Sequence, residues 1–173
     1  MPDQLLDLIK DLAVVHGKVT LSSGKEADYY IDMRRISLHR TAGPLVGAAL
    51  RSLTSDWDYD AVGGLTLGAD PVACAVMHAS GGAVDAFLVR KAQKAHGMQQ
   101  QLEGPSVEGR RVLIVDDVST TGESPLTAAR AAQEAGATVV GIALIADRGG
   151  LAKIEAEGFP ARSVYTLADL GLA

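Results

Sequence analysis

The sequence predicts a single α/β domain built on a parallel β-sheet that helices cover on both faces. The chain has 173 residues, which is about the average length of one domain. Between residues 61 and 146, short and continuously apolar segments alternate with helical patterns. Such apolar segments are typical of parallel strands buried on both sides, and these sheets bind ligands at the carboxyl ends of their strands.

The periodicity of apolar residues and the turn signals predict the order of the elements. Helices are expected at residues 3–15, 41–53, 70–79 and 125–135, and strands at 29–32, 61–65, 86–89, 111–116 and 139–146. We expect Asp3 to cap the first helix, and Ser124 and Pro125 to be the N-cap and first residue of the last one. Residues 21–25 read as a strand end and a turn. Residues 91–109 are polar and punctuated by glycine, which predicts a long functional loop.

The composition limits the classes of partner. The formal net charge is −5, so we expect no general affinity for nucleic acid or for membranes, and any anion site must be local. The single cysteine, Cys74, excludes an internal disulfide and is typical of the reducing cytoplasm. Its apolar neighbours predict that it is buried. The first residues resemble no signal peptide and no apolar run is long enough to span a membrane, so we expect a cytoplasmic protein.

The most informative segment is Val112–Ser124, with the sequence VLIVDDVSTTGES. Its apolar start predicts a buried strand, and Asp116 and Asp117 follow, where charge is costly unless it is solvated, paired or bound to a ligand. The turn Thr120–Ser124 precedes a helix, so its N–H groups and the helix dipole suit a phosphate. Taken alone, the turn is equally compatible with an ordinary strand–turn–helix junction. The chain contains no P-loop and no dinucleotide-binding glycine pattern.

Val112–Ser124 closely resembles the signature of the type I phosphoribosyltransferases, which bind 5-phosphoribosyl-1-pyrophosphate (PRPP). The resemblance implies the type I phosphoribosyltransferase fold, a parallel sheet flanked by helices with a small hood over the carboxyl ends of the strands. It also implies that two acids meet the ribose hydroxyls and that the following turn cradles the 5′-phosphate. By this resemblance the PRPP-binding residues of the segment are Asp116, Asp117, Val118, Ser119, Thr120, Thr121, Gly122, Glu123 and Ser124. The Glu123 carboxylate should point to solvent, because it would repel a phosphate.

A cationic run follows the strand predicted at 86–89. It contains Arg90, Lys91, Lys94 and His96. As a bare charge run it is equally explained as solvated surface, but its position at the start of a long loop favours a functional role. The pattern Arg-Lys-x-x-Lys-x-His-Gly resembles the catalytic loop of the orotate phosphoribosyltransferases. The resemblance implies that these four residues bind PRPP, that the first and third reach across a homodimer, and that Lys94 is catalytic together with the two acids.

Residues 23–32 resemble the amino-terminal element that folds over the base in that family. The resemblance places Tyr30 and Ile31 against orotate, and it matches Arg148 and Thr120 to further orotate contacts. Without the resemblance, the tyrosines of this element are more often ordinary packing residues, and Arg148 is equally explained as a surface residue.

Two departures from the family pattern concern phosphate-binding lysines. Many bacterial members have lysine where this chain has Ser22, and Tyr-Lys where it has Leu67-Gly68. Lys25 is the candidate to compensate for one of these lysines, and we include it in the orotate site.

The resemblance implies one phosphoribosyltransferase domain over residues 1–173, with a hood from about 1–35 and 160–173, a core at about 40–150 and a flexible lid loop at about 91–109. It further implies a magnesium-dependent transfer of phosphoribosyl from PRPP to orotate in pyrimidine synthesis. The Mg²⁺ would be held mainly by PRPP oxygens, and no protein ligand is assigned to it. Two alternatives remain at this point: a purine phosphoribosyltransferase, and a non-catalytic regulator that senses PRPP.

Overall fold

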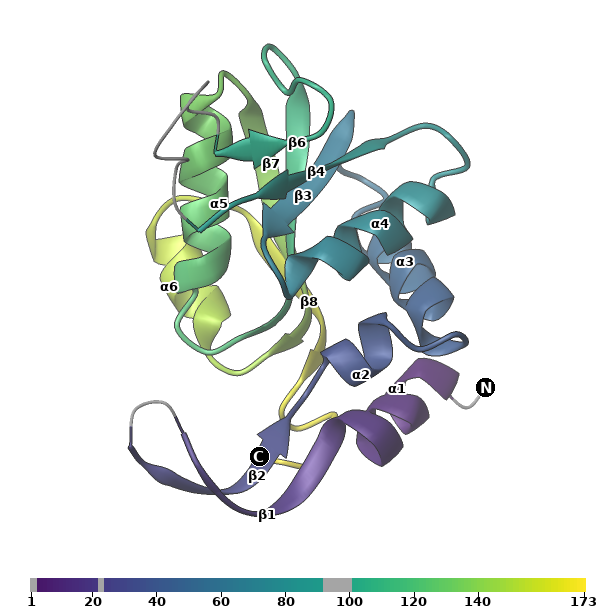
Figure 1. The fold of residues 1–173 in the computed structure, drawn as a ribbon, viewed down its shortest axis with the longest axis vertical. Helices are drawn as coiled ribbons and strands as arrows, with labels where there is room; N and C mark the ends of the chain where they lie inside the picture. The colour runs from purple at the N-terminus through teal and green to yellow at the C-terminus, as the bar shows by residue number, and fades with distance from the viewer. Residues whose placement is uncertain (1–2, 22–23, 92–100) are drawn as a thin grey trace.

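A six-stranded sheet forms the centre of the computed structural model, which describes residues 3–21, 24–91 and 101–173 (Figure 1). The strand order is β5-β4-β3-β6-β7-β8, and neighbouring strands are parallel except for β5, which pairs antiparallel with β4. The strands are β3 (Ala61–Leu65), β4 (Asp85–Val89), β5 (Leu102–Glu103), β6 (Arg111–Ser119), β7 (Thr138–Asp147) and β8 (Ala161–Thr166). The predicted parallel α/β architecture is therefore confirmed.

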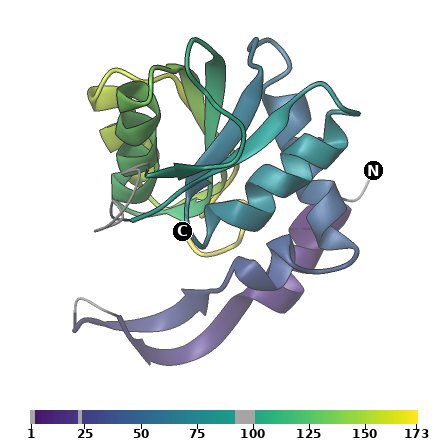
Figure 2. The same cartoon turned by 45° about the horizontal axis from the view of Figure 1, so that its top comes forward.

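Helices cover both faces of this sheet (Figure 2). On one face lie α3 (Ala42–Leu53) and α4 (Ala69–Ala79), and on the other lie α5 (Glu123–Glu134) and α6 (Gly150–Ala156). Successive side chains of β6 alternate between the two layers. Leu113 and Val115 belong to the core on the α3 and α4 side, whereas Val112 and Ile114 belong to the core on the α5 and α6 side. All four are fully buried, which explains why the strand is apolar throughout.

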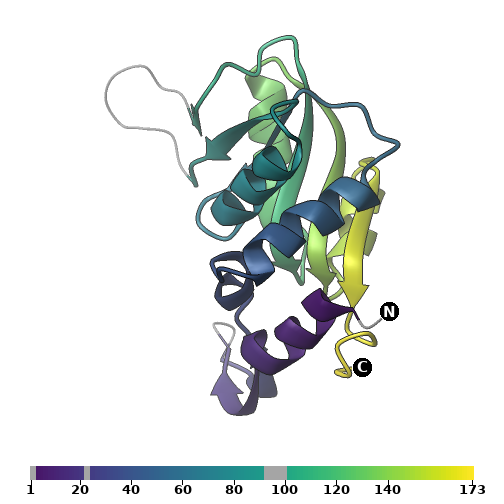
Figure 3. The same cartoon turned by 90° about the vertical axis from the view of Figure 1, so that its right-hand side faces the viewer.

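The amino-terminal residues form a hood beyond the carboxyl ends of the strands (Figures 1 and 3). It comprises α1 (Gln4–Leu8), a π-helical turn (Ile9–Ala13), the antiparallel strands β1 (Val14–Thr20) and β2 (Glu26–Ile31), and α2 (Arg34–Ser37). The Asp3 carboxylate accepts a hydrogen bond from the Leu6 amide at 3.2 Å, as expected of an N-cap. It also accepts one from the Tyr165 hydroxyl on β8, at 2.9 Å, which ties the start of the chain to the main sheet.

Three local predictions were wrong. The first helical segment ends at Ala13, and the β-branched Val14 and Val15 begin β1 instead. The N-cap of α5 is Gly122 and not Ser124, because the left-handed φ of 76° at Gly122 ends the loop two residues earlier. Cys74 is exposed on α4, because the helical period turns its neighbours Val72, Ala73 and Val76 toward the core.

Several short elements escaped the sequence patterns: β1, α2, β5, α6 and β8. β5 lies within the segment predicted as a long loop, and Leu102 there pairs with Val89. β8 joins the edge of the main sheet beside β7, so of the predicted hood segment 160–173 only the residues after Thr166 lie outside the sheet. No helix in the described residues has the length and apolar character needed to cross a membrane.

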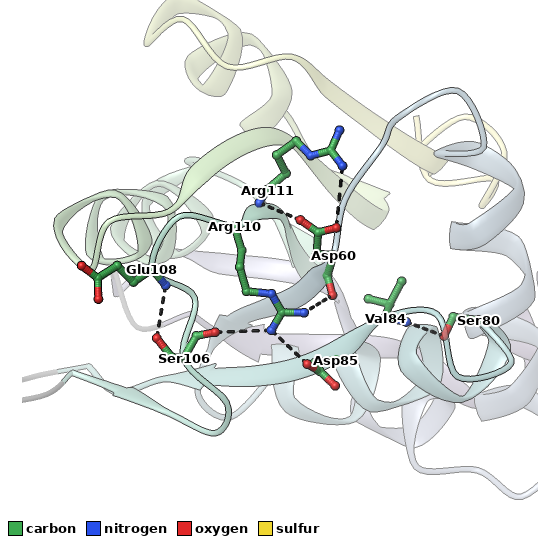
Figure 4. Close-up of polar contacts among 8 residues, drawn as sticks. All are labelled: Asp60, Ser80, Val84, Asp85, Ser106, Glu108, Arg110 and Arg111. Carbon is green, nitrogen blue, oxygen red and sulfur yellow. Dashed lines mark hydrogen bonds and ion pairs between the residues drawn. The ribbon is translucent and has the colours of Figure 1, made fainter.

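Arginines hold the amino-terminal edge of the sheet together, at the end opposite the hood (Figure 4). The Arg110 guanidinium donates to the Asp60 carbonyl at 2.8 Å and to the Asp85 carboxylate at 2.9 Å. The next residue, Arg111, donates its amide to the Asp60 carboxylate at 3.2 Å. Because these contacts join the starts of β3, β4 and β6, they fix the register of the strands whose other ends carry the site.

Candidate active site

A cavity of about 290 Å³ opens between the hood and the carboxyl ends of β3 and β6. Its described lining comes from five places in the sequence: Tyr30–Arg34, Leu65–Gly68, Lys91, Asp116–Val118 and Ser124. The strands end here because the apolar runs that bury them stop at polar residues. The arrangement brings predicted base-site, lid and phosphate-site residues around one space.

Asp116 and Asp117 lie at the carboxyl end of β6 inside this cavity. Asp116 is only 6% exposed, and its carboxylate accepts the Asp117 amide at 2.9 Å. The Asp117 carboxylate in turn accepts the Val118 amide at 2.7 Å. Burial is the main cause that raises the pKa of Asp116, and the adjacent Asp117 charge raises it further. Burial also raises the pKa of Asp117, against its amide hydrogen bonds.

The loop after β6 keeps part of its hydrogen-bonding capacity for a ligand. The Gly122 amide donates to the buried Ser119 hydroxyl at 3.0 Å, so Ser119 shapes the loop from inside. The Glu123 amide makes a long contact of 3.4 Å to the Thr121 hydroxyl, and the Glu123 side chain is exposed, as predicted. Within the described part of the chain, the amides of Thr120, Thr121 and Ser124 donate no hydrogen bond to a protein acceptor, so they are available to a phosphate.

Arg148 is held by contacts to both the core and the hood. Its amide donates to the Ser119 carbonyl at 2.8 Å, and its guanidinium lies over the Tyr29 ring, 5.2 Å from the centroid. The preceding Asp147 carboxylate accepts the amides of Gly149 at 2.9 Å and Leu151 at 3.1 Å, which fixes the turn that presents the arginine. Tyr29 was not predicted as a site residue. Tyr29 and Tyr30 are adjacent on β2, so their side chains point to opposite faces of the strand, Tyr30 toward the cavity and Tyr29 toward Arg148.

The remaining predicted residues are distributed unevenly. Lys91 lines the cavity, whereas Arg90 is paired with Glu103 of β5 at 2.7 Å. Lys25 is exposed in the hairpin turn of the hood, away from the cavity lining. Lys94 and His96 lie outside the described residues, as does Ser22.

Arg34 is a cavity-lining cation that the sequence reasoning missed. It is the second residue after Asp32, at the start of α2, and the signal that could have found it is the pair of adjacent arginines leaving a strand of the hood. Arg34 and Asp117 both line the cavity, so the two side chains face the same space.

A larger cavity of about 430 Å³ lies between β5, the following loop and α5. Its charged lining residues in the described part of the chain are Glu108 and Glu134, with no cation. We assign the site to the smaller cavity because two buried carboxylates, a hydroxyl-rich loop and two cations converge there.

The described residues contain no group of three or more His, Cys, Asp or Glu side chains arranged to hold a metal ion. The carboxylate oxygens of Asp116 and Asp117 are hard donors that suit Mg²⁺, but two adjacent acids do not complete an octahedral shell. The donor set therefore fits a magnesium ion whose ligands come largely from a bound substrate.

Comparison with known proteins agrees with this geometry. A family model described as a phosphoribosyl transferase domain matches residues 51–160. An orotate phosphoribosyltransferase of Mycobacterium avium is 61% identical over 172 residues, which cover 98% of this chain and 96% of that one. Among solved structures, Mycobacterium tuberculosis orotate phosphoribosyltransferase in complex with Fe(III) dicitrate has a TM-score of 0.90 at 60% identity, over 98% of each chain. The structure of that enzyme in complex with 5-phospho-alpha-D-ribosyl 1-diphosphate has a TM-score of 0.87 at 54% identity, over 98% of each chain.

The raised pKa of Asp116 predicts a pH-dependent cost to stability. Above its usual pKa of 3.8 the unfolded chain releases a proton that the folded protein retains, so stability falls as pH rises through the interval between the two pKa values. We expect Asp116→Asn to raise the free energy of unfolding near neutral pH by on the order of 1 kcal/mol or more. Urea denaturation from about pH 5 to about pH 8 should show the advantage of the variant growing with pH.

The exposed Glu155 on α6 supplies the control, as Glu155→Gln. This variant should follow the wild-type stability at every pH. An Asp116→Asn variant whose stability difference from wild type is constant over the same range would contradict the role of burial.

Proposed function

The chain belongs to the orotate phosphoribosyltransferase family, and on that basis we propose how its residues share the reaction. It transfers the phosphoribosyl group of PRPP to orotate, giving orotidine 5′-monophosphate and pyrophosphate in pyrimidine biosynthesis. The observation that carries the assignment to this cavity is the buried Asp116 and the half-buried Asp117 beside a loop with free amides.

The two acids and the loop hold PRPP at separate points. Asp116 and Asp117 accept hydrogen bonds from the ribose hydroxyls. These bonds compensate for the solvation that the two carboxylates lose on burial. The free amides of Thr120, Thr121 and Ser124 donate to the 5′-phosphate at the amino end of α5. Fixing the ribose and the phosphate restrains C1′ relative to the base, and this positioning supplies much of the rate enhancement.

The base site lies between the hood and the core. Tyr30 offers a ring and Ile31 an apolar surface to the flat orotate, and Arg148 offers its guanidinium to the orotate carboxylate. The orotate nitrogen attacks C1′ as the bond to the diphosphate breaks and C1′ develops positive charge. No residue of the chain is needed as a covalent nucleophile.

Charge on the departing diphosphate is neutralised from two directions. Lys91 lines the cavity, and the family resemblance adds Lys94 and His96, so we assign these residues to supply positive charge to the diphosphate. Asp116 and Asp117 would be the protein groups available to a Mg²⁺ ion brought in by PRPP, and such an ion would supply further positive charge to the leaving diphosphate.

The protein acts as a cytoplasmic homodimer in this proposal, with Arg90 and Lys94 reaching the partner's site. Arg90 supports a role outside its own cavity, because its side chain pairs with Glu103 rather than lining that cavity. The single cysteine is compatible with a reducing compartment.

The purified chain should consume orotate, followed as loss of its absorbance, only when PRPP and Mg²⁺ are both present. Chelation of the metal should abolish the reaction and added Mg²⁺ should restore it. Adenine and hypoxanthine serve as competing acceptors. Turnover of either purine at a rate above that of orotate would reject the assignment of the base.

The homodimer and its shared lid predict complementation between inactive variants. Lys94→Ala and Asp117→Asn chains, each nearly inactive alone, should regain activity after mixing and reassociation. Random pairing leaves about a quarter of all sites with both wild-type groups, so about a quarter of wild-type activity is expected.

The control mixes Lys94→Ala with Arg90→Ala, two variants in the same lid, which should not restore activity. No recovery with the first pair, despite exchange of subunits shown by mass, would mean that the lid acts within its own chain.

Tyr29 should position Arg148 for the base. A stacked guanidinium of this kind contributes about 0.5–1 kcal/mol, so Tyr29→Leu should raise the KM for orotate roughly two- to fivefold and leave the KM for PRPP unchanged. Tyr29→Phe keeps the ring and should behave as wild type.

Trp57→Leu is a matched control, because Trp57 stacks with Arg162 at 4.3 Å in a pair remote from the cavity. It should alter thermal stability and not the KM for orotate. A wild-type KM for orotate in Tyr29→Leu would separate Tyr29 from the base site.

A further inference from the structure

One cation in the cavity has no place in the mechanism given so far. Arg34 lies at the start of α2, and its side chain is 50% exposed where it enters the cavity lining. We propose that Arg34 binds the diphosphate of PRPP from within the same chain, an inference that rests on the proposed function. It would stand beside Lys91 as a cation that needs no partner subunit.

Arg34 interacts with Asp32 and more weakly with Tyr30, and these contacts leave its side chain half exposed. Its Nε lies 3.3 Å from one oxygen of Asp32, and the Nε of Arg35 lies 3.5 Å from the other oxygen. The side chains of Arg34 and Arg35 are 50% and 57% exposed, so each ion pair contributes little to stability. When Arg34 moves, Arg35 remains to neutralise Asp32, and no buried charge is left without a partner.

The part of the cavity lining that follows β3 explains why such a cation is needed. Leu67 and Gly68 stand there, and an added Cβ at Gly68 would lie only 3.0 Å from a carboxylate oxygen of Asp117. The loop therefore approaches the acid as backbone and brings no positive side chain. Across the described lining, the cations Arg34 and Lys91 face three carboxylates, those of Asp32, Asp116 and Asp117. A diphosphate that enters this space needs both cations.

The diphosphate is a better partner for Arg34 than the orotate carboxylate. Tyr30 and Ile31, which we assign to the orotate ring, also line this cavity, but Arg148, which we assign to the orotate carboxylate, stacks on Tyr29 and is not among the described lining residues. Arg34 instead shares the cavity with Asp117 and with the loop around Gly68. Its planar guanidinium can donate two parallel hydrogen bonds to a phosphate.

The test compares Arg34→Gln with Arg35→Gln. Each variant removes one arginine from Asp32, but only Arg34 lines the cavity, so Arg35→Gln controls for loss of the ion pair. We expect Arg34→Gln to weaken PRPP binding in the presence of Mg²⁺ by about 10- to 100-fold in calorimetry, and to weaken inhibition by pyrophosphate similarly. The KM for orotate at saturating PRPP should stay within about twofold of wild type, and Arg34→Lys should restore part of the affinity.

Two results would overturn the inference: equal PRPP affinity in the two glutamine variants, or a loss in Arg34→Gln that falls on orotate and not on PRPP. Equal unfolding temperatures of the two glutamine variants would show that a difference in PRPP affinity does not come from a difference in folding. Failure of the proposed function is distinct, because the wild-type protein itself would then not bind PRPP with Mg²⁺.

Discussion

Burial of two adjacent carboxylates at the end of an apolar strand is the constraint around which this molecule is arranged. Asp116 and Asp117 continue β6 directly from residues that are fully buried on both faces of the sheet. Backbone amides satisfy one oxygen of each acid, but burial still disfavours their charge. The hydroxyls of a bound ribose and a cation bound with it would relieve that cost. The acid pair therefore lowers the stability of the unliganded protein at the place that binds the sugar phosphate.

The rest of the fold makes this arrangement tolerable. Two hydrophobic layers hold the parallel strands, and the arginines at their amino ends fix the register at the far edge. The hood shares one of these layers, because its residues Ile9, Met33 and Ile36 belong to the same core as α3 and α4, and it adds polar contacts. Asp3 joins it to β8 and Tyr29 stacks on Arg148, so polar and aromatic contacts help to place it over the strand ends.

The sequence predicted those features whose physical cause is local. Apolar runs located β3, β4, β6 and β7 to within a few residues. The acid pair and the hydroxyl-rich turn predicted a phosphate site, and Asp116, Asp117 and Ser124 of that segment line the cavity. Features that depend on tertiary contact were missed. Cys74 sits in an apolar run, and only the packing of α4 decides which of those residues faces solvent. The helix cap moved to Gly122 because the buried Ser119 hydroxyl holds the loop amide, a contact that no propensity predicts.

Charge explains why an acidic chain can nonetheless bind a polyanion. With a net charge of −5, long-range attraction for PRPP is weak, and the described cavity lining holds more carboxylates than cations. Affinity must therefore come from short-range contacts that form only with the ligand in place. In the proposed mechanism, free amides, an arginine released from Asp32 and the cations Lys91 and Lys94 would each meet this condition. These contacts strengthen as the diphosphate gains charge. They therefore stabilise the departing pyrophosphate more than the intact substrate.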